Sequence, residues 1–290
     1  MNEPETTAPA TAHTAATVVV VRVAVAGRGA PYEVMLQRRS PQLKFFPGAH
    51  VFPGGRVDAA DRFADAAACC DGLAEEPRFP HLGASGELAC RVAAARELLE
   101  EAGVLLARRD GRWATAEEAA GLRGLLDAGA AFEQLVREGG WRLALGDLVP
   151  FARMVTPAVE PKRFDTHFFL AELPAGQEAR SDEVEADDLV WISPAEAVTG
   201  SMGGAVNLVP PTWVTLLQLT PFDSVAALLA WGRARPIVRV EPGTTAHGDE
   251  HLLTFPAAAI LPPADGVPAT GDLLFSYHES RGWRLDSPSG

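Results

Sequence analysis

The chain has 290 residues, of which 47% are hydrophobic and 22% charged, with a formal net charge of −13 at pH 7. This composition is ordinary for a soluble globular protein with a large core. The acidic balance argues against a sequence-independent binder of nucleic acid. Three cysteines without a C-x-x-C pair argue against a disulfide framework or a structural zinc site and favour the cytoplasm.

The chain begins with a polar tail followed by two expected strands. Residues 1–15 are rich in Thr, Ala and Pro, and we expect a disordered tail that is neither a signal nor a transit peptide. The apolar run after it is interrupted by Arg22 and is too short to span a bilayer, so we expect no membrane association. Val-rich residues 17–25 predict a strand, and residues 32–38 predict a second one, joined to the first as a hairpin by the glycine turn at 27–29.

A loop of Phe, Pro and Gly at 45–55 precedes an Ala-rich acidic segment and a helix that we expect over 87–102. Ser85 is the expected N-cap of this helix, and Gly103 stands where a C′ glycine would end it. Farther along the chain, the sequence beginning at Thr115 matches a capping box and predicts another helix.

Three glutamates on the helix over 87–102 carry the main chemical signal. Glu97, Glu100 and Glu101 stand at i, i+3 and i+4, so they share one face. Like charges at this spacing repel by about 0.2–0.5 kcal/mol per pair. By themselves the glutamates fit either a solvated acidic surface or a site for a hard divalent cation with oxygen ligands.

The surrounding residues resemble the signature of the Nudix hydrolases, G-x5-E-x7-R-E-U-x-E-E-x-G-U, in which U is a bulky aliphatic residue. Residues 96–104 match its whole second half. The first half is split, because Phe52-Pro53-Gly54-Gly55 matches the family's loop but roughly 25 residues separate it from the helix. Asp61 stands where the signature has glutamate, and Glu87 is the second candidate for that role. An interrupted signature of this kind resembles the subgroup that includes peroxisomal CoA diphosphatases.

The resemblance covers residues 16–205 and implies an α/β (α+β) fold, an α/β/α sandwich around a mixed central sheet. It further implies helical insertions at about 62–86 and 107–147 and a C-terminal extension over 206–290. Three possibilities stay open for the extension: it caps the active site, it pairs two subunits in a homodimer, or it does both.

The resemblance also implies the chemistry, which is hydrolysis of a diphosphate in a nucleoside derivative with Mg²⁺ or Mn²⁺ as the cofactor. The three glutamates would be the metal ligands, with Glu100 and Glu101 taking part in catalysis, and Arg96 would hold them in place. The general base is a glutamate of the signature or an acid on a late loop, here Glu183 or Glu185. The alternative for these two is that they are solvated acids in an acidic stretch.

The motif that CoA-cleaving members carry before the signature is matched in part. It implies substrate contacts from five residues, Arg39, Lys44, Phe52, Gly54 and Gly55. The cations among them would pair with phosphates or would simply end a strand in solvent. We therefore expect a small-molecule partner, with CoA or acyl-CoA as the leading substrate. The alternatives are ADP-ribose or a nucleoside diphosphate sugar, and a nucleotide-binding protein without catalysis. His50 and His167 are expected to be packed or exposed, because Mg²⁺ prefers oxygen ligands.

Overall fold

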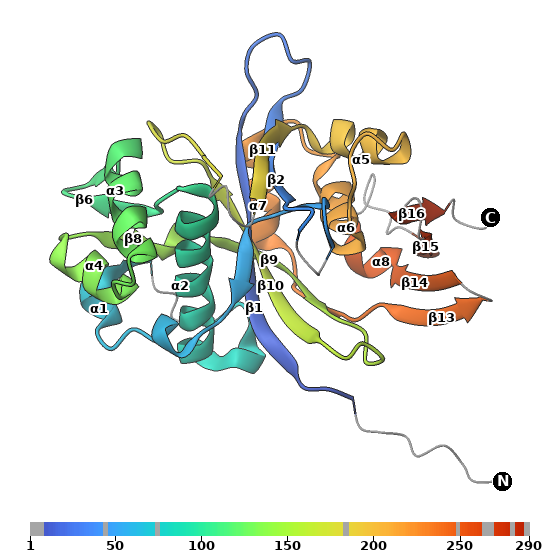
Figure 1. The fold of residues 1–290 in the computed structure, drawn as a ribbon, viewed down its shortest axis with the longest axis horizontal. Helices are drawn as coiled ribbons and strands as arrows, with labels where there is room; N and C mark the ends of the chain where they lie inside the picture. The colour runs from blue at the N-terminus through green and yellow to red at the C-terminus, as the bar shows by residue number, and fades with distance from the viewer. Residues whose placement is uncertain are drawn as a thin grey trace.

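The structure is a computed structural model that describes residues 9–42, 46–72, 76–181, 186–247, 250–262, 270–278 and 282–286. A mixed central sheet carries helices on both of its faces (Figure 1). Its strands follow the order β11-β2-β1-β10-β9-β12, with β3 paired to β2 and β4 paired to β1. Their bounds are β1 (Ala12–Val23), β2 (Tyr32–Arg39), β3 (His50–Val51), β4 (Gly54–Arg56), β9 (Val149–Val155), β10 (Arg163–Glu172), β11 (Ala186–Ile192) and β12 (Arg239–Val240).

Strand β1 lies in the middle of this sheet and is covered on both faces. Its side chains alternate, so that Val18 and Val20 enter the core on the α2 side while Val19 and Val21 enter the core on the other side. The strand begins at Ala12, and the expectation that residues 12–15 belong to a disordered tail is therefore wrong. These residues run parallel to β10 from Arg163 onward, and that partner lies about 150 residues away in sequence.

One face of the sheet is covered by α2 (Gly83–Ala102), the expected glutamate-bearing helix. It begins four residues earlier than predicted because η2 (Pro80–Leu82) leads directly into it. Its N-cap is Leu82 and makes no side-chain cap, so the prediction of Ser85 as the N-cap is wrong. The predicted end is confirmed: Gly103 has a φ of 64°, a left-handed conformation that glycine adopts without steric cost.

Beyond α2, the two expected insertions fold together (Figure 1). Strand β5 (Cys70–Asp71) of the first insertion pairs with β8 (Arg142–Ala144) of the second, in a sheet of order β5-β8-β6-β7. The capping box at Thr115 is confirmed at the start of α3. The remaining elements of this region are η1 (Ala59–Asp61), α1 (Ala66–Cys69), β6 (Ala107–Arg109), β7 (Arg112–Trp113), α3 (Ala116–Asp127), α4 (Phe132–Glu138) and η3 (Leu145–Asp147).

The opposite face of the central sheet is covered by the last third of the chain. Trp213, Phe255 and Phe275 share one hydrophobic cluster with strands β1 and β2, so residues 206–290 are continuous with the core. The elements here are α5 (Pro194–Met202), α6 (Pro210–Leu219), α7 (Val225–Ala234), β13 (Gly243–His247), β14 (Glu250–Pro256), α8 (Ala257–Ile260), β15 (Asp272–His278) and β16 (Gly282–Asp286). Among the described residues, no helix is long and apolar enough to cross a membrane. The homodimer stays a prediction.

Candidate active site

Arg96 is the centre of the carboxylate cluster on α2. Its Nε and Nη2 donate to the two oxygens of Asp61 at 2.8 and 3.1 Å, in a bidentate arrangement. Its Nη1 donates to Glu100 Oε2 at 2.6 Å and lies 2.9 Å from Glu97 Oε1. Its Nη2 also donates to the carbonyl oxygen of Arg56 at 3.2 Å, which ties the helix to β4. One guanidinium therefore holds three carboxylates in place.

The carboxylate of Glu97 lies against the backbone of Gly55, where a β-carbon would come within 2.4 Å of Oε1 and displace it. Burial raises the pKa of Glu97 to about 7, and the positive charge of Arg96 offsets only part of this effect. Burial also raises the pKa of Glu100, again with Arg96 acting in the opposite direction. When all of these groups are ionised, the cluster holds more negative charge than Arg96 neutralises.

Glu101 is held by two hydrogen bonds from the sheet side. Its Oε2 accepts from Gln37 Nε2 and from the backbone N–H of Gly54, both at 2.8 Å. Gln37 lies on β2 and is only 3% exposed. The φ of 155° at Gly54, together with the carbonyl of Ala16 beside it, leaves no room for a β-carbon. The orientation of Glu101 is therefore set by β2 and by the glycine loop.

The structure decides between the two candidates for the missing glutamate of the signature. Asp61 is 1% exposed and faces Arg96, as described above. Glu87 accepts from Arg91 at 2.8 Å and from the backbone N–H of Phe79 at 2.7 Å, near the other end of α2. Asp61 therefore belongs to the carboxylate cluster, whereas Glu87 fixes the start of the helix.

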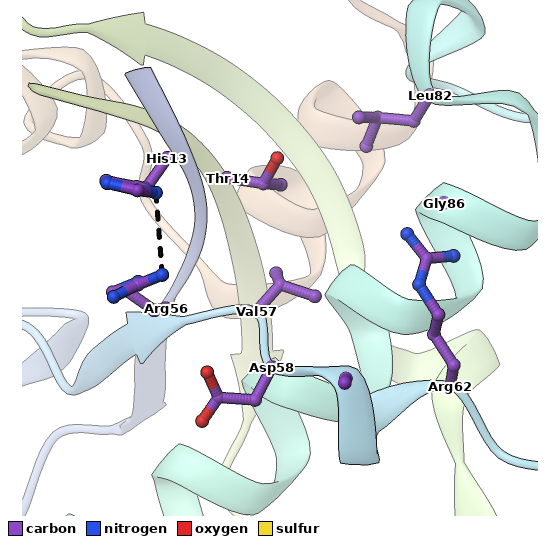
Figure 2. A pocket seen from close by; sticks show the side chains of 9 residues that line it. His13, Thr14, Arg56, Val57, Asp58, Arg62, Leu82 and Gly86 are labelled. Atoms are coloured by element: carbon purple, nitrogen blue, oxygen red, sulfur yellow. Dashed lines mark hydrogen bonds between the residues drawn. The ribbon is translucent and has the colours of Figure 1, made fainter. Parts of the chain in front are cut away.

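A cavity of about 320 Å³ opens between β1, β4 and the start of α2 (Figure 2). Arg56 and Arg62 both line it, and the Arg56 carbonyl also accepts a hydrogen bond from Arg96. Arg56 Nη2 lies 3.4 Å from His13 Nδ1. The complete lining is His13, Thr14, Arg56, Val57, Asp58, Ala59, Arg62, Leu82 and Gly86. Two guanidinium groups in one cavity suit a ligand that carries phosphate.

Comparisons with known proteins identify the family. The family model of the NUDT19 Nudix domain matches residues 81–219. The human acyl-coenzyme A diphosphatase NUDT19 is 30% identical over 277 residues, covering 77% of this chain and 71% of its own. The chain belongs to the Nudix hydrolases. The chicken protein of the same name is 29% identical over 276 residues, covering 80% of this chain and 73% of its own. The crystal structure of a Nudix hydrolase from Alicyclobacillus acidocaldarius matches with a TM-score of 0.64 and 30% identity, covering 76% of this chain and 96% of that chain.

The Nudix family implies a divalent-metal cofactor, and the donor set fits one. Glu97, Glu100 and Glu101 offer only oxygen ligands, as Mg²⁺ and Mn²⁺ prefer. Burial raises the pKa of Glu97, and the positive charge of Arg96 offsets only part of this rise. A divalent cation would supply the missing positive charge.

Other residues that the sequence assigned to this Nudix site stay predictions. Phe52 is 5% exposed and packs in the hydrophobic cluster of Trp213, while its predicted substrate contact stays a prediction. It is buried because the loop turns this ring toward the α6 side of the sheet. Arg39 ends β2 and is partly buried. Lys44, Glu183 and Glu185 lie outside the described residues, and their roles stay predictions.

Gln37 is the residue of the cluster that the sequence did not identify. It is a polar residue directly after the apolar run Val34-Met35-Leu36 on a buried strand. A polar side chain at such a position needs a hydrogen-bond partner, and this was the available signal. Its partner Glu101 is 64 positions away, so the pairing was not evident from the sequence.

Proposed function

We propose that this Nudix hydrolase is a metal-dependent diphosphatase of CoA and acyl-CoA. The observation that carries the proposal is the carboxylate cluster around Arg96. It occurs in a chain that is 29–30% identical to two proteins named acyl-coenzyme A diphosphatase, over about three quarters of its length. The cluster supplies the means to hydrolyse a diphosphate, and the relatives indicate which diphosphate.

In the proposed reaction, water attacks one phosphorus atom of the CoA diphosphate and the P–O bond to the bridging oxygen breaks. The attacking oxygen stays on one phosphate and the bridging oxygen leaves with the other. CoA and one water thus give 4′-phosphopantetheine and adenosine 3′,5′-bisphosphate. An acyl-CoA gives the corresponding acyl-phosphopantetheine.

Each residue of the cluster has a defined task in this proposal. Glu97, Glu100 and Glu101 would hold Mg²⁺ or Mn²⁺, which neutralises phosphoryl charge and lowers the pKa of bound water. Arg96 positions the first two through its Nη1 atom. Gln37 and the N–H of Gly54 orient Glu101. Glu183 and Glu185 stay the candidates for the general base outside the helix.

The cavity at the start of α2 is the proposed binding site for a phosphate of CoA. Arg56 at the end of β4 and Arg62 directly after η1 line it, and both are exposed to solvent and thus to a ligand. Because the diphosphate has to lie at the glutamates, it is not available to this cavity. The phosphate left to bind there is the 3′-phosphate of the adenosine. CoA carries this group and ADP-ribose lacks it.

A substrate panel tests the proposed activity. Purified protein is incubated with Mg²⁺ or Mn²⁺ and with CoA, acetyl-CoA, a long-chain acyl-CoA, ADP-ribose or a nucleoside diphosphate sugar. The products are separated by chromatography. We expect the highest kcat/KM for CoA or an acyl-CoA, and a loss of orders of magnitude in Glu101→Gln. Faster turnover of ADP-ribose or the nucleotide sugar would contradict the substrate assignment. Tight nucleotide binding without hydrolysis would indicate a binding protein.

A second comparison tests the cavity. In Arg62→Ala we expect the KM for CoA to rise by about 10-fold or more, because a hydrogen bond to a charged group contributes about 1.5–3 kcal/mol. The KM for dephospho-CoA, which lacks the 3′-phosphate, should stay unchanged. Arg137→Ala on the exposed side of α4 is the matched control. An equal rise for both substrates would place the diphosphate, instead of the 3′-phosphate, in this cavity.

A further inference from the structure

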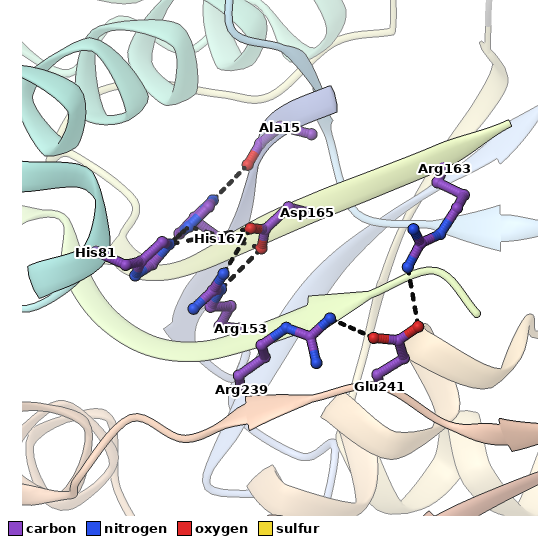
Figure 3. A network of polar contacts seen from close by, with 8 residues as sticks. All are labelled: Ala15, His81, Arg153, Arg163, Asp165, His167, Arg239 and Glu241. Carbon is purple, nitrogen blue, oxygen red and sulfur yellow. Dashed lines mark hydrogen bonds and ion pairs between the residues drawn. The ribbon is translucent and has the colours of Figure 1, made fainter. Parts of the chain in front are cut away.

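A second group of potential metal ligands lies at the other end of α2, where η2 meets β10 (Figure 3). It consists of His81, Asp165 and His167, whose ligand atoms all lie within 4.8 Å of one another. Asp165 and His167 are two positions apart on β10 and share a face of the sheet. His81 precedes Glu97 by 16 positions, which along a helix corresponds to roughly 24 Å, so this group is separate from the glutamates.

The protonation state of His167 follows from its surroundings. Its Nδ1 lies 3.2 Å from the carbonyl oxygen of Ala15, which only accepts hydrogen bonds, so Nδ1 carries the proton. The ring is fully buried, and burial favours its neutral form. A neutral ring with its proton on Nδ1 has its lone pair on Nε2. Histidines that bind a metal usually donate their other ring N–H to a carbonyl or a carboxylate, as His167 does here.

The lone pair of His167 faces the second histidine. His81 Nε2 lies 3.0 Å from His167 Nε2. The ring planes differ by only 16°, and the ring centroids are 5.1 Å apart. Because the centroids are so much farther apart than the Nε2 atoms, the rings lie edge to edge with these nitrogens facing each other. In the absence of a metal, the two nitrogens share one proton.

Asp165 supplies the negative charge of this group. Its oxygens lie 4.0 Å from His81 Nε2 and 3.8 Å from His167 Nε2. Arg153 donates to both oxygens at 2.8 and 2.7 Å and fixes the carboxylate. Each carboxylate oxygen has a second lone pair that this pairing does not use. Hydrogen-bonded carboxylates of this kind are common among metal ligands.

We propose that His81, Asp165 and His167 bind a borderline divalent ion such as Zn²⁺, at a site separate from the oxygen ligands of the glutamate cluster. The ion takes the place of the hydrogen bond between the two Nε2 atoms, and the proton of His81 moves from its Nε2 to its Nδ1 so that both rings bind as neutral imidazoles. Neighbouring ligand atoms of a tetrahedral zinc site lie about 3.4 Å apart, and the separations here bracket that value. The His81 side chain is 31% exposed, so solvent reaches the site and this ring has room to adjust.

The bound ion would connect two distant parts of the chain. His81 lies just before α2, whereas Asp165 and His167 lie on the central sheet. Two imidazoles and one carboxylate are the ligands that select Zn²⁺ or a similar first-row ion over Mg²⁺. We therefore expect the ion to stabilise the attachment of the first insertion to the sheet, independently of the hydrolysed substrate.

Isothermal titration calorimetry of the EDTA-treated protein tests the site. Zn²⁺ is added in the presence of excess Mg²⁺, so that Mg²⁺ already occupies the glutamate cluster. We expect one Zn²⁺ per chain, and an affinity at least about 100-fold lower in His81→Ala. Asp165→Asn should also weaken binding. His13→Ala, which removes an exposed histidine outside the group, should bind as the wild type does, and so should Glu97→Gln. Co²⁺ in place of Zn²⁺ should give the strong visible absorption of a tetrahedral site.

Two results would overturn the proposal. The first is a wild-type protein that binds no Zn²⁺ under these conditions, which would leave the histidines as a hydrogen-bonded pair only. The second is Zn²⁺ binding that persists unchanged in His81→Ala, because the ion would then be held elsewhere. Circular dichroism spectra of the variants establish that each one is folded.

Discussion

The α-carbon of Gly55 lies so close to the carboxylate of Glu97 that a β-carbon on residue 55 would come within 2.4 Å of Oε1. Glu97 is held between this backbone and Arg96, whose Nη1 lies 2.9 Å away. The loop glycine and the helix glutamate are 42 positions apart in the sequence. Their contact connects the two separated halves of the Nudix signature in space.

The first prediction concerns this contact. In Gly55→Ala the new methyl group displaces Glu97 from its position, and a displacement of about 1 Å in an active site lowers rates by about 100-fold. We expect kcat/KM for CoA to fall by at least that factor while the circular dichroism spectrum is retained. Gly121→Ala on α3 is the matched control, because its β-carbon meets open space. Equal activities of the two variants would contradict the assigned role of Gly55.

The second prediction separates Asp61 from Glu87. Asp61→Asn weakens the bidentate pairing with Arg96, and we expect kcat to fall by about 10- to 100-fold with a small change in stability. Glu87→Gln instead breaks a buried pair with Arg91, which costs about 3 kcal/mol of unfolding free energy. Its kcat should stay near the wild-type value. Steady-state kinetics and urea denaturation measure both, and the reverse pattern would make Glu87 the residue of the signature.

The third prediction follows from the raised pKa of Glu97. In the folded, metal-free protein this pKa is about 7, above its ordinary value of 4.5. Between these values the folded state binds more protons at this group than the unfolded state does. The stability of the metal-free protein should therefore fall as pH rises from about 4.5 to about 7. Thermal unfolding in EDTA measures this dependence, which should become flatter in Glu97→Gln.

Added Mg²⁺ provides the complementary measurement. The ion competes with the proton for the Glu97 carboxylate, so its stabilising effect should grow as pH rises through about 7. We expect a larger increase in Tm from Mg²⁺ at pH 8 than at pH 5.5. An increase of the same size at both pH values would show that Glu97 is ionised throughout this range.

The fourth prediction tests whether residues 206–290 complete the core. Trp213 on α6 is 1% exposed and lies 6.0 Å from the ring of Phe275 on β15. Trp213→Ala leaves a large cavity between these elements and the sheet, and we expect a loss of about 3–5 kcal/mol. Trp113→Ala, at a partly exposed position on β7, should cost much less. Urea denaturation compares them, and similar losses would contradict a shared core.

Patterns of neighbouring residues in the sequence were sufficient to predict the glutamate face of α2, the end of this helix and the presence of β1. The glutamates share a face of α2 because a helix repeats every 3.6 residues, and five consecutive positions suffice to show this. Gly103 ends the helix because glycine adopts the left-handed backbone conformation without steric cost. The Val-rich run predicted β1 because branched side chains favour a strand, although the strand begins earlier where β10 offers partners.

Contacts between distant positions were decided only by the tertiary structure. Asp61 meets Arg96 across 35 positions, and Gln37 meets Glu101 across 64. The two insertions form one sheet through β5 and β8, for which no pattern within either insertion was available. The burial of Phe52 likewise depends on α6, far along the chain. The sequence by itself thus determined the helix, its glutamates and the family resemblance, because these depend on neighbouring residues. The partners that orient those glutamates required the fold, because only the packing of the sheet against α2 brings them together.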